Sequence, residues 1–544
     1  MPRNLGNLSP ELVDLIIHYL HDLKFLNPEV PLTPTKASSF LPKDEKLSRY
    51  STISRQWQYA VERYTFAHLT LSSGTLQQLN RIVGSCPRRI QLVKNLGYTV
   101  NLPAYSRNRR SCVERRGEHE ENLRVFRTGV VDIFALIKSW EKHISPVGLG
   151  LNLRAEAPGE HKRESAERNE FLGLEVEEPQ EEEEESWGIG ADRWAHRDHS
   201  LTLNDDSREA PALPILPFVN GLGIGSMGRR IHPVAIEQMI LALPNLKDLS
   251  IRLPPVKPKR KALRAELRNA LAKALEAPTL SQLEFLGLEL DEPTPVNHNF
   301  ETALERDPDF PKGDHLSRAI CKLAQRSLKN LEILKACVIS PVLWGLDPLH
   351  QDREGAIFPH LEMLAVDIAH ITYDGRWYFT GNPEDADYDE DEIEEMMNET
   401  IDDNPDIDSK YTTSSFNSED NEHEIDEDRE AFLNGEEPYY SWRRTPDPEL
   451  FNPLVKGLVS ATMRMPKLKQ ALVSTFSLAE EARDIEFHFV VPGELIGDSS
   501  GFSVEATKTE WHVTPRRDSD WKLPDDIRRM MEKHVGKMGE VIVD

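Results

Sequence analysis

The chain has 544 residues, of which 39% are hydrophobic and 29% are charged, and its formal net charge is −27. Most of this charge lies in residues 384–430, where 22 acidic side chains stand against only Lys410 and Arg429. The acidity is therefore a property of one segment and does not bear on the fold. Because phosphate contacts need clustered Lys and Arg, we do not expect the chain to bind nucleic acid.

The cysteines and the hydropathy of the chain indicate the compartment in which we expect the protein. The four cysteines form no CxxC pair, and their spacing suits neither a zinc site nor a disulfide framework, so we expect reduced thiols inside the cell. We see no secretory leader and no run of about 18 apolar residues, and so expect no membrane span. The location expected is the cytoplasm, the nucleus or both. The basic run at 257–261 is either a nuclear-import signal or, as we favour, the solvated start of a helix.

The first 65 residues predict two helices joined by a proline-rich loop. Ser9 is placed to cap the first helix and Pro10 suits its first position. The apolar face of that helix consists of Leu8, Leu12, Leu15, Ile16, Tyr19 and Leu20. Residues 27–43 hold four prolines and cannot continue a helix. A second helix is expected from Asp44 to about Tyr64.

The next segments predict alternating strands and helices. Strands are expected at 66–71, 96–102 and 147–153, and helices at 75–83 and 122–142. From 155 to 210 the chain is charged and almost free of periodic apolar residues, which predicts a disordered insertion. A second disordered insertion, the acidic one, is expected at 382–437.

A loose leucine motif follows the first insertion. Its copies are Leu246-x-x-Leu249-x-Ile251, Leu283-x-x-Leu286-x-Leu288, Leu331-x-x-Leu334-x-Ala336, Leu361-x-x-Leu364-x-Val366 and a weaker Leu468-x-x-Ala471-x-Val473. The first residues of these copies are 37, 48, 30 and 107 apart, whereas regular leucine-rich repeats have periods of about 20–29. Helical patterns at 233–243, 261–276, 316–327 and 454–465 precede most copies. One unit cannot cover such a motif alone, so neighbouring units must stack.

These patterns together predict an α/β chain: an N-terminal helical module followed by an irregular leucine-rich-repeat-like αβ solenoid with disordered acidic insertions. Strands at 485–491 and a last helix at 524–534 would cap the array. The expected divisions are 1–65 for the helical module, 66–154 for the first solenoid units, 155–210 for the charged insertion, 211–381 for the main solenoid, 382–437 for the acidic insertion and 438–544 for the last units and cap.

The amino terminus resembles the F-box family. Leu8-Ser9-Pro10-Glu11-Leu12 is similar to the family's Leu-Pro-x-Glu-Leu start, and Ser54-Arg55-x-Trp57 to its Ser-Lys-x-Trp close. Pro10 is displaced by one place, and the proline-rich loop lengthens the module by about twenty residues. The remainder, including Gly375-Arg376-Trp377-Tyr378-Phe379, is similar to the repeat region of fungal F-box proteins.

The resemblance implies a contact with the Skp-type adaptor of a cullin–RING ubiquitin ligase. The residues implied to form the adaptor-facing surface or the core of the module are Leu8, Pro10, Leu12, Ile16, Leu20, Ser54, Arg55 and Trp57. The protein would then be an adaptor that holds a protein substrate, not yet identified, on its solenoid. A stand-alone binding scaffold with a degenerate F-box is the alternative.

Other patterns predict little chemistry. Gly223-x-Gly225-x-x-Gly228 fits the dinucleotide fingerprint, but the following strand ends without an acidic residue, so we expect a flexible turn there and keep a nucleotide-dependent enzyme as a third hypothesis. His196 and His199, near Asp192 and Asp198, are metal-ligand types but lie in the charged insertion.

Aromatic and acidic runs complete the search for sites. Three consecutive aromatics at 377–379 predict burial, or one exposed anchor. The acidic stretch lacks the Ca²⁺-loop pattern, so we expect a solvated loop, with capture of a basic partner the alternative. No Gly-x-Ser-x-Gly, HExxH or P-loop occurs. We therefore expect no catalytic residue, cofactor or metal.

Overall fold

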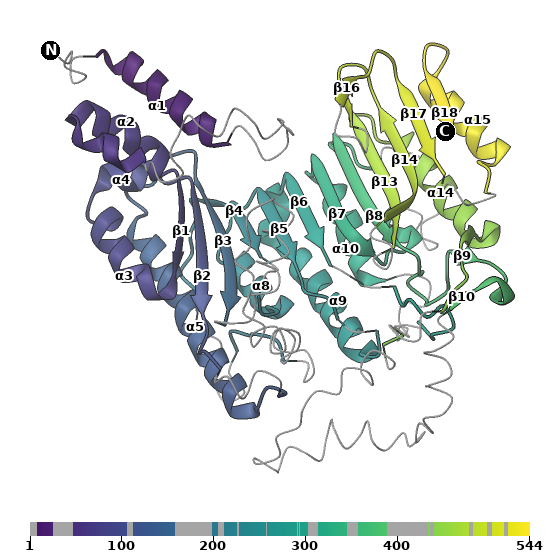
Figure 1. The fold of residues 1–544 in the computed structure, drawn as a ribbon, viewed down its shortest axis with the longest axis horizontal. Coiled ribbons are helices and arrows are strands. Elements are labelled where there is room, and N and C mark those ends of the chain that lie inside the picture. The colour runs from purple at the N-terminus through teal and green to yellow at the C-terminus, as the bar shows by residue number, and fades with distance from the viewer. Residues whose placement is uncertain are drawn as a thin grey trace.

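The computed structural model describes residues 8–25, 47–105, 112–157, 199–204, 212–225, 228–256, 258–290, 292, 294–302, 314–344, 357–388, 434–435, 440–477, 482–497, 503–515 and 521–543. In these residues the protein is a mixed α/β molecule with one large, mostly parallel sheet of twelve strands. The first described helix, α1, and the last described strand, β18, lie at opposite ends of the molecule (Figure 1). The prediction of an α/β chain is confirmed.

The large sheet follows the order of the chain. Nine parallel strands lie side by side: β1 (His68–Ser72), β2 (Asn95–Asn101), β3 (Leu149–Glu156), β4 (Val219–Ile224), β5 (Asp248–Arg252), β6 (Phe285–Glu289), β7 (Asn330–Cys337), β8 (Met363–Ala369) and β13 (Gln470–Ser477). They are followed by the antiparallel β14 (Ala482–Val490) and β17 (Glu510–Thr514) and by β18 (Glu540–Val543), which is parallel to β17.

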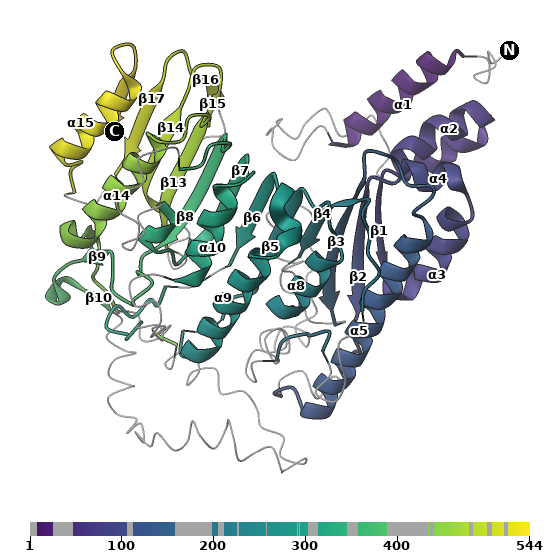
Figure 2. The same ribbon diagram turned by 180° about the vertical axis from the view of Figure 1, so that it is seen from behind.

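Helices connect the strands and line one face of the sheet (Figures 1 and 2). They are α3 (Leu76–Leu79), α4 (Pro87–Leu92), α5 (Arg116–Ser139), α8 (Pro233–Leu241), α9 (Lys261–Leu275), α10 (His315–Ala324), α14 (Pro448–Thr462) and α15 (Asp525–Val535). Short two-stranded pairs form outside the sheet: β9 (Phe379–Thr380) with β12 (Thr445–Pro446), β10 (Asp387–Tyr388) with β11 (Tyr440–Ser441), and β15 (Leu495–Gly497) with β16 (Ser503–Glu505).

The amino-terminal segment folds as α1 (Pro10–Phe25), a short 3₁₀ turn η2 (Leu47–Thr52) and α2 (Arg55–Thr65). The single helix predicted from Asp44 to Tyr64 is therefore wrong. Ser54 has extended backbone, and its hydroxyl accepts a hydrogen bond from the backbone N–H of Trp57. Serine favours this capping position over a helix interior, because its side chain competes for backbone hydrogen bonds.

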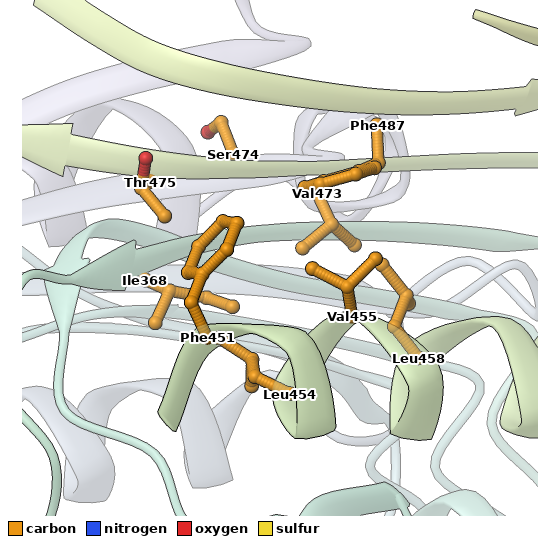
Figure 3. A pocket seen from close by; sticks show the side chains of 9 residues that line it. All are labelled: Ile368, Phe451, Leu454, Val455, Leu458, Val473, Ser474, Thr475 and Phe487. Atoms are coloured by element: carbon orange, nitrogen blue, oxygen red, sulfur yellow. The ribbon is translucent and has the colours of Figure 1, made fainter. Parts of the chain in front are cut away.

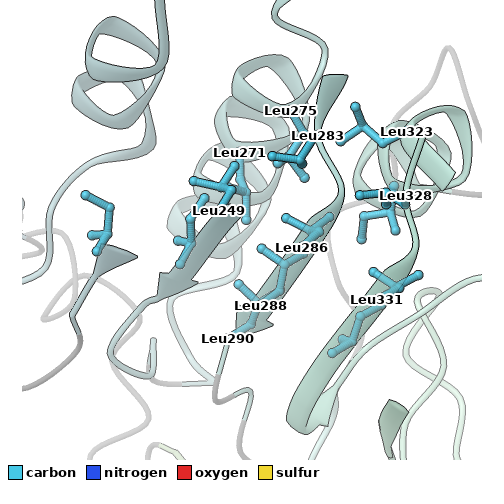
Figure 4. Packing of buried hydrophobic residues seen from close by; sticks show 14 of the residues in the cluster. Leu249, Leu271, Leu275, Leu283, Leu286, Leu288, Leu290, Leu323, Leu328 and Leu331 are labelled. Atoms are coloured by element: carbon cyan, nitrogen blue, oxygen red, sulfur yellow. The ribbon is translucent and has the colours of Figure 1, made fainter. Parts of the chain in front are cut away.

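The main core lies between the strands and the helices. In Figure 4, Leu249, Leu286 and Leu331 project from three adjacent strands toward leucines of α9 and α10. All three are fully buried, as are Leu275 and Leu323 on the helices. Burying one such side chain contributes roughly 1.5–3 kcal/mol, so the repeated leucine positions dominate the stability of this half of the molecule.

Strand register corrects the third copy of the leucine motif. Leu286 pairs with Leu331, and Leu288 pairs with Ile333, so the copy is Leu328-x-x-Leu331-x-Ile333 and starts three residues earlier than predicted. Leu328 and Ile333 are fully buried, whereas the predicted Leu334 is only half-buried. After Ile333, strand β7 becomes irregular: Lys335 has φ 60, and the register to β8 shifts there.

The same frame extends to the first strands, where it was not predicted. In the register of the sheet, β1, β2 and β4 carry Phe66-x-x-Leu69-x-Leu71, Val93-x-x-Leu96-x-Tyr98 and Val219-x-x-Leu222-x-Ile224. With the third copy corrected, the original four intervals become 37, 45, 33 and 107 residues. The spacing is irregular because the connections differ in length, while the positions inside each strand do not.

A row of alternating charges lies just before five of the parallel strands. Lys247 and Lys329 pair with Glu284 at 3.4 and 2.6 Å, and Lys469 pairs with Glu362 at 2.7 Å. These contacts lower the pKa of both carboxyl groups below the usual range, through hydrogen bonds to the lysines first. The pairs are exposed and contribute little to stability, but their alternation favours this one alignment of neighbouring units.

Parts of both predicted insertions belong to the described fold, while the rest of each lies outside the described residues. At the first, Ala155 belongs to β3, and Leu201 and Leu203 are buried in the main core, with Leu201 bridged to Ile231. Residues 158–198 and 205–211 lie outside the described residues. At the second, residues 382–388 form a short turn and β10, and Asn434 is buried. Residues 389–433 likewise lie outside the described part of the chain, as does the proline-rich loop.

The corrected frame can be tested by alanine substitution. Ile333→Ala should lower the free energy of unfolding by about 2–5 kcal/mol, because a fully buried branched side chain leaves a cavity. Leu334→Ala removes a half-buried side chain from the neighbouring position and should cost about 1 kcal/mol. Urea denaturation of the two variants measures the difference. A larger loss for Leu334→Ala would contradict the frame.

Candidate functional site

The amino-terminal helices have a small core of their own. Its fully enclosed members are Val13, Ile17, Trp57, Ala60 and Val61, and they form a cluster separate from the main core. Val13 and Ile17, which anchor α1 in this cluster, were not among the predicted residues. Each follows directly after a predicted residue, Leu12 or Ile16, and so widens the apolar face of the helix. Their four-residue spacing, which places both on one side of a helix, could have identified them from sequence.

The predicted adaptor-binding residues divide between this small core and the surface. Trp57 is buried, and Ser54 serves as the cap of α2. Leu8, Ile16 and Ser54 are half-buried, Pro10 and Arg55 are exposed, and the side chain of Leu20 lies outside the described residues. Leu12 is 49% exposed, and its neighbour Leu15 is 61% exposed. The module thus presents two leucines to solvent on one helix.

A buried carboxylate fastens the amino-terminal module to the sheet. Glu62, at the end of α2, is almost fully buried and forms ion pairs with Arg88 and Arg89 of α4, the second at 2.9 Å. Arg88 also stacks over the ring of Tyr59, 4.0 Å from its centroid. Removing this carboxylate would leave two guanidinium groups without their counter-charge, which destabilises a partly buried ion pair. The position of the module therefore depends on Glu62.

The face of the sheet opposite the helices carries mostly small and polar side chains, with Phe285, Met363 and Leu472 half-buried among them. One residue from each parallel strand forms a continuous row across it: Thr70, Gly97, Asn152, Gly223, Ser250, Gly287, Glu332, Ala365 and Leu472. Thr70, Asn152 and Ser250 are exposed. A flat polar face of this kind suits contact with a protein surface better than enclosure of a small molecule.

Asparagines lie across glycines on this open face. A Cβ atom on Gly223 would stand 3.0 Å from the side-chain carbon Cγ of Asn152 and closer still to its oxygen, and a Cβ on Gly150 would meet Asn95 in the same way. A side chain at either position would therefore displace the asparagine amide that now lies over the glycine. The amide groups that lie over these strands give the face hydrogen-bonding capacity along its length.

The glycine pattern at 223–228 is not a nucleotide-binding turn. Gly223 lies inside β4, paired with Asn152 and Ser250, so the predicted flexible turn is wrong at this glycine. Gly228 has φ +127 and lies against the carbonyl of Ala155. A dinucleotide fingerprint needs its first glycines in the turn between a strand and a helix, which this arrangement does not provide. Ser226 and Met227 lie outside the described residues.

The open face carries two histidines on its last strands. His488 of β14 lies opposite His512 of β17, with ring centroids 6.2 Å apart, and its Nε2 is 3.0 Å from the amide nitrogen of Gln470. Burial, with His512 adding to the effect, lowers the pKa of His488 to about 4. The His488 imidazole is therefore neutral at pH 7.

The aromatic run at 377–379 is internal. Trp377, Tyr378 and Phe379 are all buried, which confirms the expected burial and leaves no exposed anchor there. Arg443 lies over the ring of Trp377 at 5.2 Å and over that of Trp442 at 4.0 Å. These contacts fix the chain around β9 and β12 and offer no pocket for a ligand.

One small cavity lies between α14 and the sheet (Figure 3). It is lined by Ile368, Phe451, Leu454, Val455, Leu458, Val473, Ser474, Thr475 and Phe487, and about 10 Å³ of it is open to a water-sized sphere. That is the lower limit for a single water molecule. With two hydroxyl groups and no charged side chain in its lining, it has no means of carrying out chemistry.

A buried ionic network joins α9 and α10. Nη1 of Arg268 donates to both carboxylate oxygens of Glu292, at 2.7 and 2.8 Å, and its Nη2 donates to Oδ1 of Asp314 at 3.0 Å. Asp314 also caps α10 by accepting a hydrogen bond from Ser317 N–H. The Coulombic attraction of Arg268 holds the pKa of the Asp314 carboxyl below its usual range despite burial. The network ties α9 to α10 and supports the fold, and it leaves Oδ2 of Asp314 buried without a hydrogen-bond partner.

A second buried carboxylate gathers histidines. Glu114 precedes α5 and is fully buried, and its Oε2 lies 2.6 Å from Nδ1 of His199 and 3.6 Å from Nδ1 of His119. The two imidazole rings stack at 4.0 Å between centroids. Burial first, and then the nearby His199, lower the pKa of His119 to about 4.

Of the three residues in this cluster, only His199 was a candidate ligand in the sequence. His199 was considered with His196, Asp192 and Asp198, and those three lie outside the described residues. The partners of His199 are instead 80 and 85 positions earlier in the chain. No local spacing connects residues so far apart, so only the folded arrangement brings them together.

Comparison with known proteins gives no relative. No protein-family model matches the chain, and no curated protein matches it either. Among the helices of the described ranges, we find none with the length and hydropathy of a bilayer-spanning segment.

The attachment of the amino-terminal module can be tested at Glu62. Glu62→Gln removes the charge that Arg88 and Arg89 share, and losing such a charged hydrogen bond costs about 1.5–3 kcal/mol. Amide hydrogen exchange in α2 should become about tenfold faster or more, while protection in β5–β8 stays unchanged. Asp14→Asn, which breaks the exposed pair with Arg63, is the matched control and should have little effect. Unchanged exchange in Glu62→Gln would contradict this role.

Proposed function

We propose that the protein is a substrate-recruiting F-box adaptor of a cullin–RING ubiquitin ligase. The observation that supports this most directly is the exposed pair Leu12 and Leu15 on α1. The helix that carries them belongs to a module with its own core, held at the end of the sheet through Glu62. Exposed leucines on a separately packed module favour a partner that covers them.

The strand-and-helix body supports the second half of the proposal. In this interpretation it is an irregular leucine-rich-repeat-like solenoid, whose open face holds the protein to be ubiquitinated. The row from Thr70 to Leu472 spans nine neighbouring strands, which is a long surface for a protein partner. The adaptor performs no chemistry. It raises the effective concentration of the acceptor lysine near the ligase.

A stand-alone scaffold with a degenerate F-box is the second candidate. It is favoured by the internal roles of Ser54, which caps α2, and Trp57, which fills the module's own core. It is also favoured by the long separation of α1 from η2, which end and begin at Phe25 and Leu47. Under this candidate the open face binds a protein, but α1 does not bind a ligase.

The adaptor contact can be tested with the two exposed leucines. The double variant Leu12→Asp/Leu15→Asp places charges where a partner would bury apolar surface, and should abolish co-purification with the Skp-type adaptor. Substituting Trp57 would be uninformative, because it unfolds the module. Leu241→Asp, on α8 of the body, is the matched control with an equally exposed leucine and should bind normally.

The outcomes separate the two candidates. Loss of the complex in the double variant, with α2 protection from hydrogen exchange retained, supports the adaptor. If the unaltered chain binds no Skp-type adaptor, the proposal of an F-box adaptor is wrong and the stand-alone scaffold is the better candidate.

The open face can be tested by site-specific cross-linking. A photoreactive residue in place of Ser250, on the open face of β5, should cross-link to protein partners in cell extract. The control places the same photoreactive residue at Lys273, an exposed position on the helix side of the sheet. It should give none of the cross-linked products that the residue at position 250 gives. Identical products from both positions would argue against the open face as the binding surface.

A further inference from the structure

The cluster around Glu114 has the composition of a metal site. Two imidazole nitrogens and one carboxylate oxygen converge, with one donor atom from each of Glu114, His119 and His199 within 4.8 Å of the others. Two histidines and one carboxylate are a common ligand set for zinc, and imidazole nitrogen also suits other first-row divalent ions. No other such group of three occurs in the described ranges.

The two oxygens of Glu114 have different surroundings. Oε1 accepts hydrogen bonds from Tyr105 Oη at 3.0 Å, Asn122 Nδ2 at 2.6 Å and Arg229 Nη2 at 2.7 Å. Oε2 is left facing the two histidines. Donors that hold one oxygen of a carboxylate and orient the other toward histidines are the usual outer contacts of a metal ligand.

His119 supplies an independent observation. Its Nδ1 is buried yet has no hydrogen-bond partner, although it points toward Oε2 of Glu114 at 3.6 Å. An unsatisfied buried polar atom is uncommon and often marks a missing water or ion. The side chains of His119 and His199 keep 17% and 15% of their surface exposed.

We propose that Glu114, His119 and His199 bind one Zn²⁺ ion, through Oε2 and the two Nδ1 atoms. A tetrahedral zinc site with bonds of about 2.0–2.1 Å places its ligand atoms roughly 3.3 Å apart. The present separations from Oε2, 2.6 and 3.6 Å, lie on either side of that value. The two imidazole rings now stack nearly parallel, with 17° between their planes, so both rings would have to turn about their side-chain bonds to aim the two Nδ1 atoms at one ion.

The ion would join segments far apart in the chain. Glu114 and His119 lie at the start of α5, whereas His199 opens the short described segment whose Leu201 and Leu203 enter the main core. Zinc would fasten this segment to α5. Such an ion stabilises the folded protein in proportion to its binding, because the unfolded chain has no preformed site.

Zinc titration of the full chain tests the proposal. Calorimetry should find one tight Zn²⁺ site, and His119→Ala/His199→Ala should weaken it about 100-fold or more, since even the loss of an outer contact costs 10–100-fold. Tyr105→Phe removes one donor to Oε1 and should weaken it about tenfold. His488→Ala/His512→Ala, a histidine pair on the open face, is the matched control and should bind zinc like the unaltered chain.

Co²⁺ supplies a second measurement. Visible absorption typical of tetrahedral Co²⁺ should appear with the unaltered chain and be absent from His119→Ala/His199→Ala, whereas the acidic stretch at 384–430 is the same in both. If the alanine variant does not fold, His119→Gln/His199→Gln keeps polar side chains and replaces it. Equal zinc affinity in the unaltered chain and the folded double variant, or no tight site in the unaltered chain, would overturn the proposal.

Discussion

The structure depends on burial from one side. Each parallel strand turns two or more apolar side chains, most of them aliphatic, toward the helices, and these side chains are buried only between a helix and the neighbouring strands. The same alternation turns the intervening residues to the open face, so the polar row there is a consequence of the core pattern. A single constraint thus fixes the core, the order of strands and the surface proposed to hold a partner.

Local elements could be predicted from sequence because burial on one face leaves a period in the chain. The helices at 233–241, 261–275 and 315–324 begin and end within a few residues of their predicted limits. The frame of β7 could not be predicted, because Leu331 and Leu334 satisfy the motif as well as Leu328 and Leu331 do. Only the pairing of Leu331 with Leu286 decides between them.

The candidate sites were harder to predict than the fold. A helical stripe shows that one face of α1 is apolar but does not show which of Leu12 and Val13 is buried, since that depends on the angle at which α2 crosses it. The Glu114 cluster was invisible for a different reason. Its members are separated by 85 positions, and the carboxylate acquires its role only when β-sheet order brings Arg229 and His199 beside it.

The pairing of β10 with β11 has a practical consequence. Tyr388 and Tyr440 are direct partners across these two short strands, so the two ends of the segment between them are adjacent. Within that segment, Asn434 is buried and accepts a hydrogen bond from Lys259 N–H, and the Gly435 carbonyl accepts one from Asn297 N–H. A shorter connection or a fluorescent domain could be introduced between Tyr388 and Asn434, provided that the contacts of Asn434 and Gly435 are kept. The site therefore offers an engineer a place to shorten or label the protein while leaving its architecture intact.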